Sequence, residues 1–243
     1  VLLPVLRAYT VQLIPGVSCL SYFFARLASP WQEAAVISCH GREGNLVDTV
    51  RRNKLTFVLT GDNISALALQ LELAGFGKLL ATVGENLGTK EERIQAMEIS
   101  ELLRNVFSQL SVLLIENPGA DARVRFGIPD EAFERGDVPM TKAEVRAFTL
   151  SRLALKPDAV CCDIGCGTGS VSVEMAFAAY HGHVFAIDQS AEAIRLTQAN
   201  AKRFHIGNLT AICARAPEAL CGLPALDAVF IGGSGGNMEE IFA

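Results

Sequence analysis

The sequence predicts an α/β fold, with a parallel sheet in its second half, from three observations. Apolar stretches near 159–163, 183–187, 209–213 and 227–231 have the length of buried strands. They alternate with helical stretches near 170–180, 190–204 and 216–220, a rhythm typical of parallel strands joined by right-handed crossovers. The first strand runs into a glycine-rich turn that opens a helix, where a nucleotide-type ligand commonly binds.

The segment before the first of these strands predicts one more helix. Thr141 is a good N-cap residue, and Glu144 three positions later completes the pattern of a capping box. We therefore expect a helix that starts at Thr141.

The first half of the chain alternates in the same way and predicts a second α/β unit. Strands are expected at 34–38, 55–59, 78–83 and 111–115, with a helix at 63–75 that stops at Gly75 and Gly77. Turn residues at 116–121 indicate a boundary, so we predict two domains, 1–119 and 120–243.

Composition excludes several classes of protein. The chain has 243 residues, 21 Lys and Arg against 26 Asp and Glu, and a net charge of −5, so it lacks the basic excess of a nucleic-acid binder. Its apolar runs are shorter than the roughly 18–20 residues of a membrane span. The seven cysteines have neither C-x-x-C nor zinc-ligand spacing, which predicts reduced cysteines, no bound metal and a cytoplasmic location.

The spacing of the glycines distinguishes between two classes of nucleotide ligand. A dinucleotide fingerprint needs glycine at 165, 167 and 170, but position 170 is Ser and the pattern here is G-x-G-x-G. Asp163 lies two residues before the first glycine, and Asp188 ends the next strand, where it can accept hydrogen bonds from ribose hydroxyls. An acid like Asp188 serves NAD and S-adenosylmethionine (SAM) equally, whereas the glycine spacing is similar to that of class I SAM-dependent methyltransferases.

Further motifs point to a family. The second half resembles the decarboxylating, carbon-15 module of the precorrin-6Y methyltransferases of cobalamin biosynthesis. The first half resembles their carbon-5 module, which has a tetrapyrrole methylase fold. The matching stretches of the second half are 127–130, 135–142, 163–173 and Phe230-Ile231-Gly232-Gly233-Ser234-Gly235-Gly236, and those of the first half are 14–19, 39–42, 59–63 and 82–88.

The resemblance implies a set of binding residues. SAM contacts are implied at Thr141, Gly165, Cys166, Gly167, Thr168, Gly169, Asp188 and Ala214, where the last position could slip to Ala216. In the first half, Ser18 and Cys19 occupy the place of a SAM-binding pair of hydroxyl residues, with Cys19 departing from the pattern. Substrate contacts are assigned to His40, Arg42, Gly232, Gly233 and Ser234, and Glu85 and Asn86 are similar candidates. We interpret all seven cysteines as structural, and His181, His183 and His205 as surface residues.

The resemblance implies methylation of a precorrin at carbons 5 and 15, with loss of carbon dioxide from the ring C acetate, by a homo-oligomer. No catalytic residue is predicted. Both ends look truncated, so we expect only the C-terminal lobe of the tetrapyrrole methylase, an inactive carbon-5 site, and a class I domain without its last strands. The alternatives are a class I methyltransferase for another small molecule, RNA or protein, with the first half a non-catalytic assembly domain, and an NAD-binding module, which Ser170 disfavours.

Overall fold

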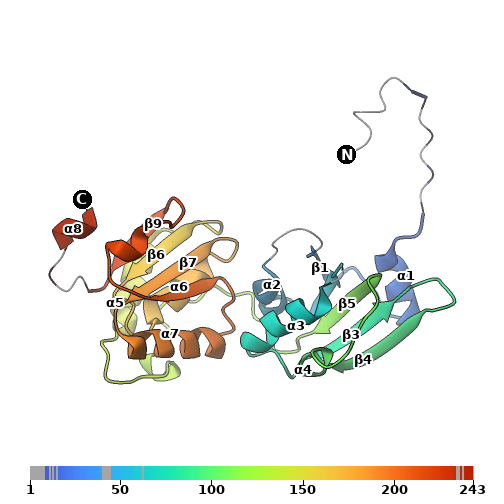
Figure 1. Cartoon of the computed structure of the whole chain (residues 1–243), viewed down its shortest axis with the longest axis horizontal. Coiled ribbons are helices and arrows are strands. Elements are labelled where there is room, and N and C mark those ends of the chain that lie inside the picture. The colour runs from blue at the N-terminus through green and yellow to red at the C-terminus, as the bar shows by residue number, and fades with distance from the viewer. Residues whose placement is uncertain are drawn as a thin grey trace.

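The computed structural model describes residues 9, 10, 12, 14, 16–39, 45–61, 63–233, 236 and 238–242. They form two β-sheets side by side in an α/β architecture, each with its own helices (Figure 1). We call the residues of the five-stranded sheet and its helices (16–116) the first unit, and residues 127–242 around the four-stranded sheet the second unit. A domain boundary at residues 119 and 120 stays a prediction.

The sheet of the first unit is mixed. Its strands are β1 (Ala35–Ser38), β2 (Leu55–Leu59), β3 (Leu80–Glu85), β4 (Arg93–Glu98) and β5 (Ser111–Glu116), in the order β1-β2-β5-β3-β4. Only β1 and β2 pair in parallel, and the other three pairings are antiparallel. The helices are α1 (Cys19–Arg26), α2 (Leu46–Arg52), α3 (Ile64–Leu73) and α4 (Ile99–Leu102).

The expected strands and the helix at 63–75 of this unit are confirmed, but four elements were not predicted. Strand β4 pairs only with β3 at the sheet edge, and its residues are half-buried or exposed, so it lacks the apolar signal of a core strand. Helices α1, α2 and α4 are short. Helix α1 is held by Phe23 and Phe24, whose rings each lie 6.0 Å from that of Phe57.

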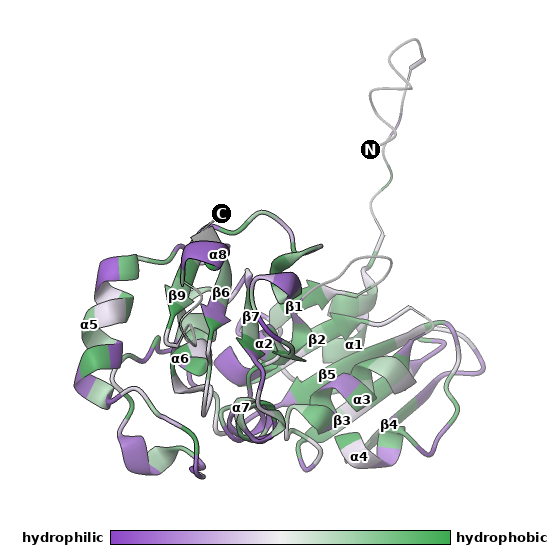
Figure 2. Cartoon of the chain, turned by 60° about the vertical axis from the view of Figure 1, so that its left-hand side comes forward, coloured by the Kyte–Doolittle hydropathy of each residue, from purple (hydrophilic) through white to green (hydrophobic). Residues whose placement is uncertain are grey.

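The second unit contains the predicted parallel sheet. Strands β6 (Val160–Ile164), β7 (His183–Asp188), β8 (Leu209–Cys213) and β9 (Ala228–Ile231) run in the order β8-β7-β6-β9, and every pairing is parallel. Helices α5 (Ala143–Leu153), α6 (Ser170–Ala178) and α7 (Ala191–Arg203) pack successively against one another. Hydrophilic residues gather on α7, whereas hydrophobic residues dominate the strands of the first sheet (Figure 2). Two 3₁₀ turns (Asp130–Ala132 and Glu218–Leu220) and α8 (Met238–Phe242) complete the unit.

Strand β6 positions the glycine turn. The chain passes from β6 to β7 and β8 on one side, and then returns to place β9 on the other side of β6. The strand order therefore reverses at β6, and open α/β sheets bind ligands in the crevice at that point. Cys161 and Cys162 alternate between the two cores that flank the sheet, which explains why a near-continuous apolar run is needed here.

Two local predictions were wrong. Helix α5 starts at Ala143 with Lys142 as N-cap, and no side chain caps it, so Thr141 and Glu144 form no capping box. Instead, the Thr141 carbonyl accepts a hydrogen bond from the buried Arg146 guanidinium, which holds this residue outside the helix. The segment expected to be helical at 216–220 is only a 3₁₀ turn, Glu218–Leu220. No helix built from the described residues is long and apolar enough to cross a membrane.

Candidate functional site: a cleft at the glycine turn

The glycines of the turn adopt backbone conformations that are unfavourable for residues with a side chain. Gly165, Gly167 and Gly169 have φ angles of +73°, +54° and +73°, in the left-handed region where a Cβ atom is strained. The amides of Gly165 and Cys166 both donate to the carbonyl of Ile187, which ties the turn to the end of β7. This geometry directs the chain from β6 into α6.

Each of these glycines also lets another segment approach. A Cβ atom on Gly165 would lie 2.6 Å from the carbonyl oxygen of Gly233, and one on Gly169 would lie 2.6 Å from Oγ1 of Thr197. A Cβ atom on Gly167 would collide with the Pro139 carbonyl. We expected the glycines to make room for a ligand, and the structure adds that they first make room for the walls of the cleft.

A cleft of about 360 Å³ lies at this turn, within the size range of small-molecule sites. It brings together predicted residues that are distant in the sequence, from the ends of all four strands. Besides Pro139, Gln189, Arg215 and Ile241, its lining consists of Ile164, Gly165, Gly167, Ile187, Asp188, Ala214, Ala216, Gly232 and Gly233. Ala214 and Ala216 both line it, so the two candidate positions after the third strand belong to one wall.

Asp188 lies at the carboxyl end of β7, and its carboxylate can accept further hydrogen bonds. Its Oδ2 accepts a hydrogen bond from the Gly167 amide at 3.0 Å, and its Oδ1 accepts one from the Ser190 amide at 2.9 Å. A carboxylate has about four lone-pair sites, so two remain for a ligand. Two vicinal hydroxyls, as on a ribose, fit this acceptor, and the isoleucines and alanines of the lining fit an aromatic base.

Asp163 is fully buried beneath the turn. Its Oδ2 accepts a hydrogen bond from the Ser172 hydroxyl, whereas its Oδ1 has no hydrogen-bond partner among the described residues. Burial raises the pKa of this carboxyl to about 7, against the hydrogen bonds from Ser172, and the negative charge of Asp188 raises it further. Asp163 thus braces the start of α6 from below and does not line the cleft.

Cys166, Thr168 and Gly169 of the turn are not among the residues that line the cleft. The Cys166 thiol is buried, 3.4 Å from the Thr197 hydroxyl, and burial raises its pKa to about 12. Such a thiol stays protonated at neutral pH, which supports a structural role. The Thr168 hydroxyl is buried without a described partner. Contacts of these three residues with a cofactor stay predictions.

The predicted residues of the first half lie elsewhere. Ser18 caps α1 by accepting a hydrogen bond from the Ser21 amide at 3.1 Å, and Cys19 is the first residue of that helix. Both lie at the start of α1 in the first unit, and neither lines the glycine cleft (Figure 1). His40, Arg42 and Ser234 lie outside the described residues.

Hydrogen bonds tie Glu85 and Asn86, two further candidates for substrate contact, into the first unit. Glu85 is buried and accepts hydrogen bonds from Arg93 and the Ser108 amide, which lower its pKa against the effect of burial. Asn86 accepts a hydrogen bond from the Ser108 hydroxyl. These contacts support a structural role.

Sequence reasoning missed Arg146, the largest fully buried side chain. Its guanidinium pairs with the equally buried Glu174 at 2.8 Å and with Asp130 at 2.9 Å. It also donates to the carbonyls of Ile128 and Thr141, so it fixes the segment that carries Pro139 over the cleft. The sequence signal that could have revealed this buried pair was an acidic residue, Glu174, inside the otherwise apolar helix α6.

The prediction that His205 is a surface residue was wrong. Its ring is half-buried and stacks on Phe76 of the first unit at 4.3 Å between centroids, and its Nδ1 lies 2.8 Å from the Ala74 carbonyl oxygen. His205 therefore joins the two units. Among the described residues, no group of three or more His, Cys, Asp or Glu side chains could hold a metal ion.

The parallel sheet, the glycine turn at its reversal point and Asp188 define the second unit as a Rossmann-like nucleotide-binding fold. Residues 131–243 match the family model of the precorrin methyltransferase domain, and residues 2–103 match that of the tetrapyrrole (corrin/porphyrin) methylases. The two matches correspond to the two halves of the fold.

Named relatives agree with these matches. A precorrin-6Y C(5,15)-methyltransferase (decarboxylating) from a Sinorhizobium species is 35% identical over 93% of this chain and 56% of its own length. A probable cobalt-precorrin-6B C(15)-methyltransferase (decarboxylating) from Pyrobaculum calidifontis is 50% identical over 47% of this chain and 60% of its own. A crystal structure of a precorrin-6Y C5,15-methyltransferase from Geobacter metallireducens GS-15 is 45% identical, covers 48% of this chain and 62% of that one, and has a TM-score of 0.46.

This chain is a homologue of the precorrin-6Y C(5,15)-methyltransferases, so the resemblance read from its motifs is confirmed. It spans 56% of the length of the Sinorhizobium relative and 60% of that of the Pyrobaculum relative.

Proposed function

We propose that this chain is part of a SAM-dependent C-methyltransferase that methylates a precorrin at carbons 5 and 15 and removes carbon dioxide from the ring C acetate. The observation that carries the proposal is the cleft at the reversal point of the second sheet. It joins the glycine turn, Asp188 and Ala214 in the half that matches the precorrin methyltransferase domain.

The residues of the cleft would hold SAM by its nucleoside. Asp188 would accept hydrogen bonds from the ribose hydroxyls, and Ala214 and Ala216 leave room for adenine beside Ile187. When bound, SAM supplies a methyl group on a sulfonium, which a nucleophilic carbon takes by in-line displacement. The work of the chain is then to orient the two reactants and exclude water.

Gly232 and Gly233 follow β9 at the same edge of the sheet and close one side of the cleft. Nothing lies within 4 Å of a Cβ atom built on Gly233, so its outer face is open. We assign the tetrapyrrole to this side, next to the SAM position. A bulky residue at Gly233 would then obstruct the substrate and spare the cofactor.

We further propose that the enzyme is a cytoplasmic homo-oligomer. All seven cysteines are free, which suits a reducing compartment. Val145 and Phe148, three residues apart on α5, are 53% and 70% exposed, an apolar face that suits burial against a second copy. Light scattering coupled to gel filtration tests the oligomeric state, and a monomer would exclude it.

Calorimetric titration with SAM and, separately, with NAD tests the cofactor. We expect heat with SAM alone, and heat with NAD alone would overturn the proposal. Incubation with SAM and either a precorrin or bulk tRNA tests the substrate by mass spectrometry. Methyl transfer to tRNA and not to the precorrin would exclude the tetrapyrrole.

A further inference from the structure

A second cleft, of about 460 Å³, lies between the two units. Its lining comes from both: Arg51 and Phe76 belong to the first unit, and Phe177, Arg203 and His205 to the second. The connecting segment adds Asp121 and Arg125. The glycine cleft shares none of these residues, so this is a separate site.

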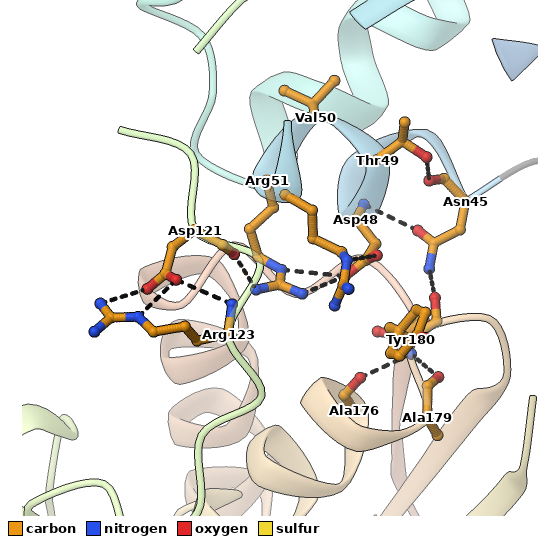
Figure 3. Close-up of polar contacts among 12 residues, drawn as sticks. Asn45, Asp48, Thr49, Val50, Arg51, Asp121, Arg123, Ala176, Ala179 and Tyr180 are labelled. Atoms are coloured by element: carbon orange, nitrogen blue, oxygen red, sulfur yellow. Dashed lines mark hydrogen bonds and ion pairs between the residues drawn. The ribbon is translucent and has the colours of Figure 1, made fainter. Parts of the chain in front are cut away.

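The contact that forms this cleft is closely fitted. A Cβ atom on Gly207 would collide with the Val47 side chain, so only glycine lets α2 approach here. The Asn45 amide donates to the Tyr180 carbonyl at 2.7 Å (Figure 3). The Arg51 guanidinium lies over the Phe177 ring, 4.6 Å from its centroid. The walls of the cleft are therefore held in place by packing and hydrogen bonds.

The cleft is cationic although the chain carries a net charge of −5. Three arginines line it (Arg51, Arg125 and Arg203), against one aspartate, Asp121. The Asp121 carboxylate already accepts hydrogen bonds from Arg123 (Figure 3) and from Arg125, and these two arginines hold its pKa well below the usual range. The only acid of the lining is thus neutralised by two arginines.

The arginines differ in their free donors. Arg51 is buried and uses its guanidinium nitrogens on the Asp48 carboxylate and the Asp121 carbonyl, so it serves as a wall (Figure 3). The Arg203 guanidinium makes no hydrogen bond or ion pair with any described residue. Arg125 keeps donors beyond its bond to Asp121. The lining also includes three phenylalanines, Phe76, Phe177 and Phe204.

Cationic donors in a cleft that is partly lined by aromatic side chains suit an apolar scaffold whose edge carries carboxylates. We propose that the cleft between the units binds the acetate and propionate edge of a tetrapyrrole. This is a second binding position for the substrate class of the proposed function, on which the inference rests. It would keep an acidic tetrapyrrole attached to the chain at a site apart from the glycine cleft.

Fluorescence titration with uroporphyrin III, a porphyrin whose rim carries only acetate and propionate groups, tests the inference on the full chain. Arg125→Gln and Arg203→Gln should each weaken uroporphyrin binding about tenfold, since each removes a charge-assisted hydrogen bond. The matched control is Arg152→Gln, which removes the same charge from the exposed end of α5 and should leave the affinity unchanged. Thermal unfolding confirms that all variants are folded.

Three results would overturn the inference. The parent chain could fail to bind uroporphyrin, or both cleft variants could bind it like the control. Binding could also fall with Arg215→Gln alone, which would place the porphyrin in the glycine cleft. SAM titration of the same proteins separates the two proposals. A parent chain that does not bind SAM would contradict the proposed function, whereas the uroporphyrin titration tests the cleft between the units.

Discussion

The Asn45 side chain donates a hydrogen bond to the Tyr180 carbonyl at 2.7 Å, which links the start of α2 in the first unit to the residues just after α6 in the second (Figure 3). The same region is held from within the second unit by Asn208, whose amide donates to the Ala179 carbonyl at 2.7 Å. Helix α6 therefore has the glycine turn at its N-terminus and the other unit at its C-terminus.

Gly207→Ala should destabilise the junction between the units. The new methyl group would collide with Val47, and overpacking of this kind costs about 1–3 kcal/mol. Urea unfolding measures the change in the free energy of unfolding. Gly16→Ala is the control, because nothing lies within 4 Å of a Cβ atom there, and an equal loss in both variants would contradict the fitted contact.

Glu174→Gln should be strongly destabilising. It leaves the fully buried Arg146 with only Asp130 as a charged partner, and breaking a buried ion pair costs about 3–5 kcal/mol. The exposed pair of Arg195 with Glu192 is the control, since Glu192→Gln should change the urea midpoint little. Comparable midpoints for the two variants would show that the buried network contributes no more than a surface pair.

Asp163→Asn should change how stability depends on pH. The folded pKa is raised to about 7, above the ordinary value of 3.8, so the folded state holds the proton more tightly. The parent chain therefore loses stability from this group as pH rises from about 4 through about 7, by on the order of 2–4 kcal/mol.

The asparagine cannot ionise, so Asp163→Asn should gain stability relative to the parent between pH 5 and pH 8. Urea unfolding of both proteins at the two pH values measures this difference. Asp137→Asn, at an exposed position, should show no such change. A parent-to-variant difference that is independent of pH would contradict a raised pKa at Asp163.

Much of the second unit could be predicted because its signals are local. The four strands and the positions of Gly165, Gly167 and Asp188 follow from apolar runs, glycine spacing and strand ends, and the structure places these three residues in one cleft. The cap at Thr141 failed because the Thr141 carbonyl accepts a hydrogen bond from Arg146, which is itself held by the distant Glu174. Likewise, His205 and Gly207 obtain their roles from the first unit, and no local pattern encodes that contact.

Cysteine reactivity should follow burial and pKa. Cys213 and Cys221 are exposed, whereas Cys166 is buried and its pKa is raised to about 12. Brief maleimide labelling at pH 8, read by mass spectrometry of peptides, should modify the first two and spare Cys166. Labelling after unfolding in urea is the control and should reach all three. Rapid modification of Cys166 in the folded chain would contradict its assignment as a structural thiol.

Asp188→Asn should weaken SAM binding about tenfold to a hundredfold, because a neutral amide replaces the carboxylate that would accept the ribose hydroxyls, and hydrogen bonds to a charged group contribute about 1.5–3 kcal/mol. Isothermal calorimetry measures the affinity, with Asp137→Asn as the matched control at an exposed aspartate.

A loss of SAM affinity in Asp188→Asn could also arise indirectly, since Asp188 accepts a hydrogen bond from the Gly167 amide and so supports the turn. Asp188→Glu separates the two: it keeps the charge, so partial recovery of affinity supports a direct contact with the ligand. An unchanged affinity in Asp188→Asn would remove this residue from the cofactor site.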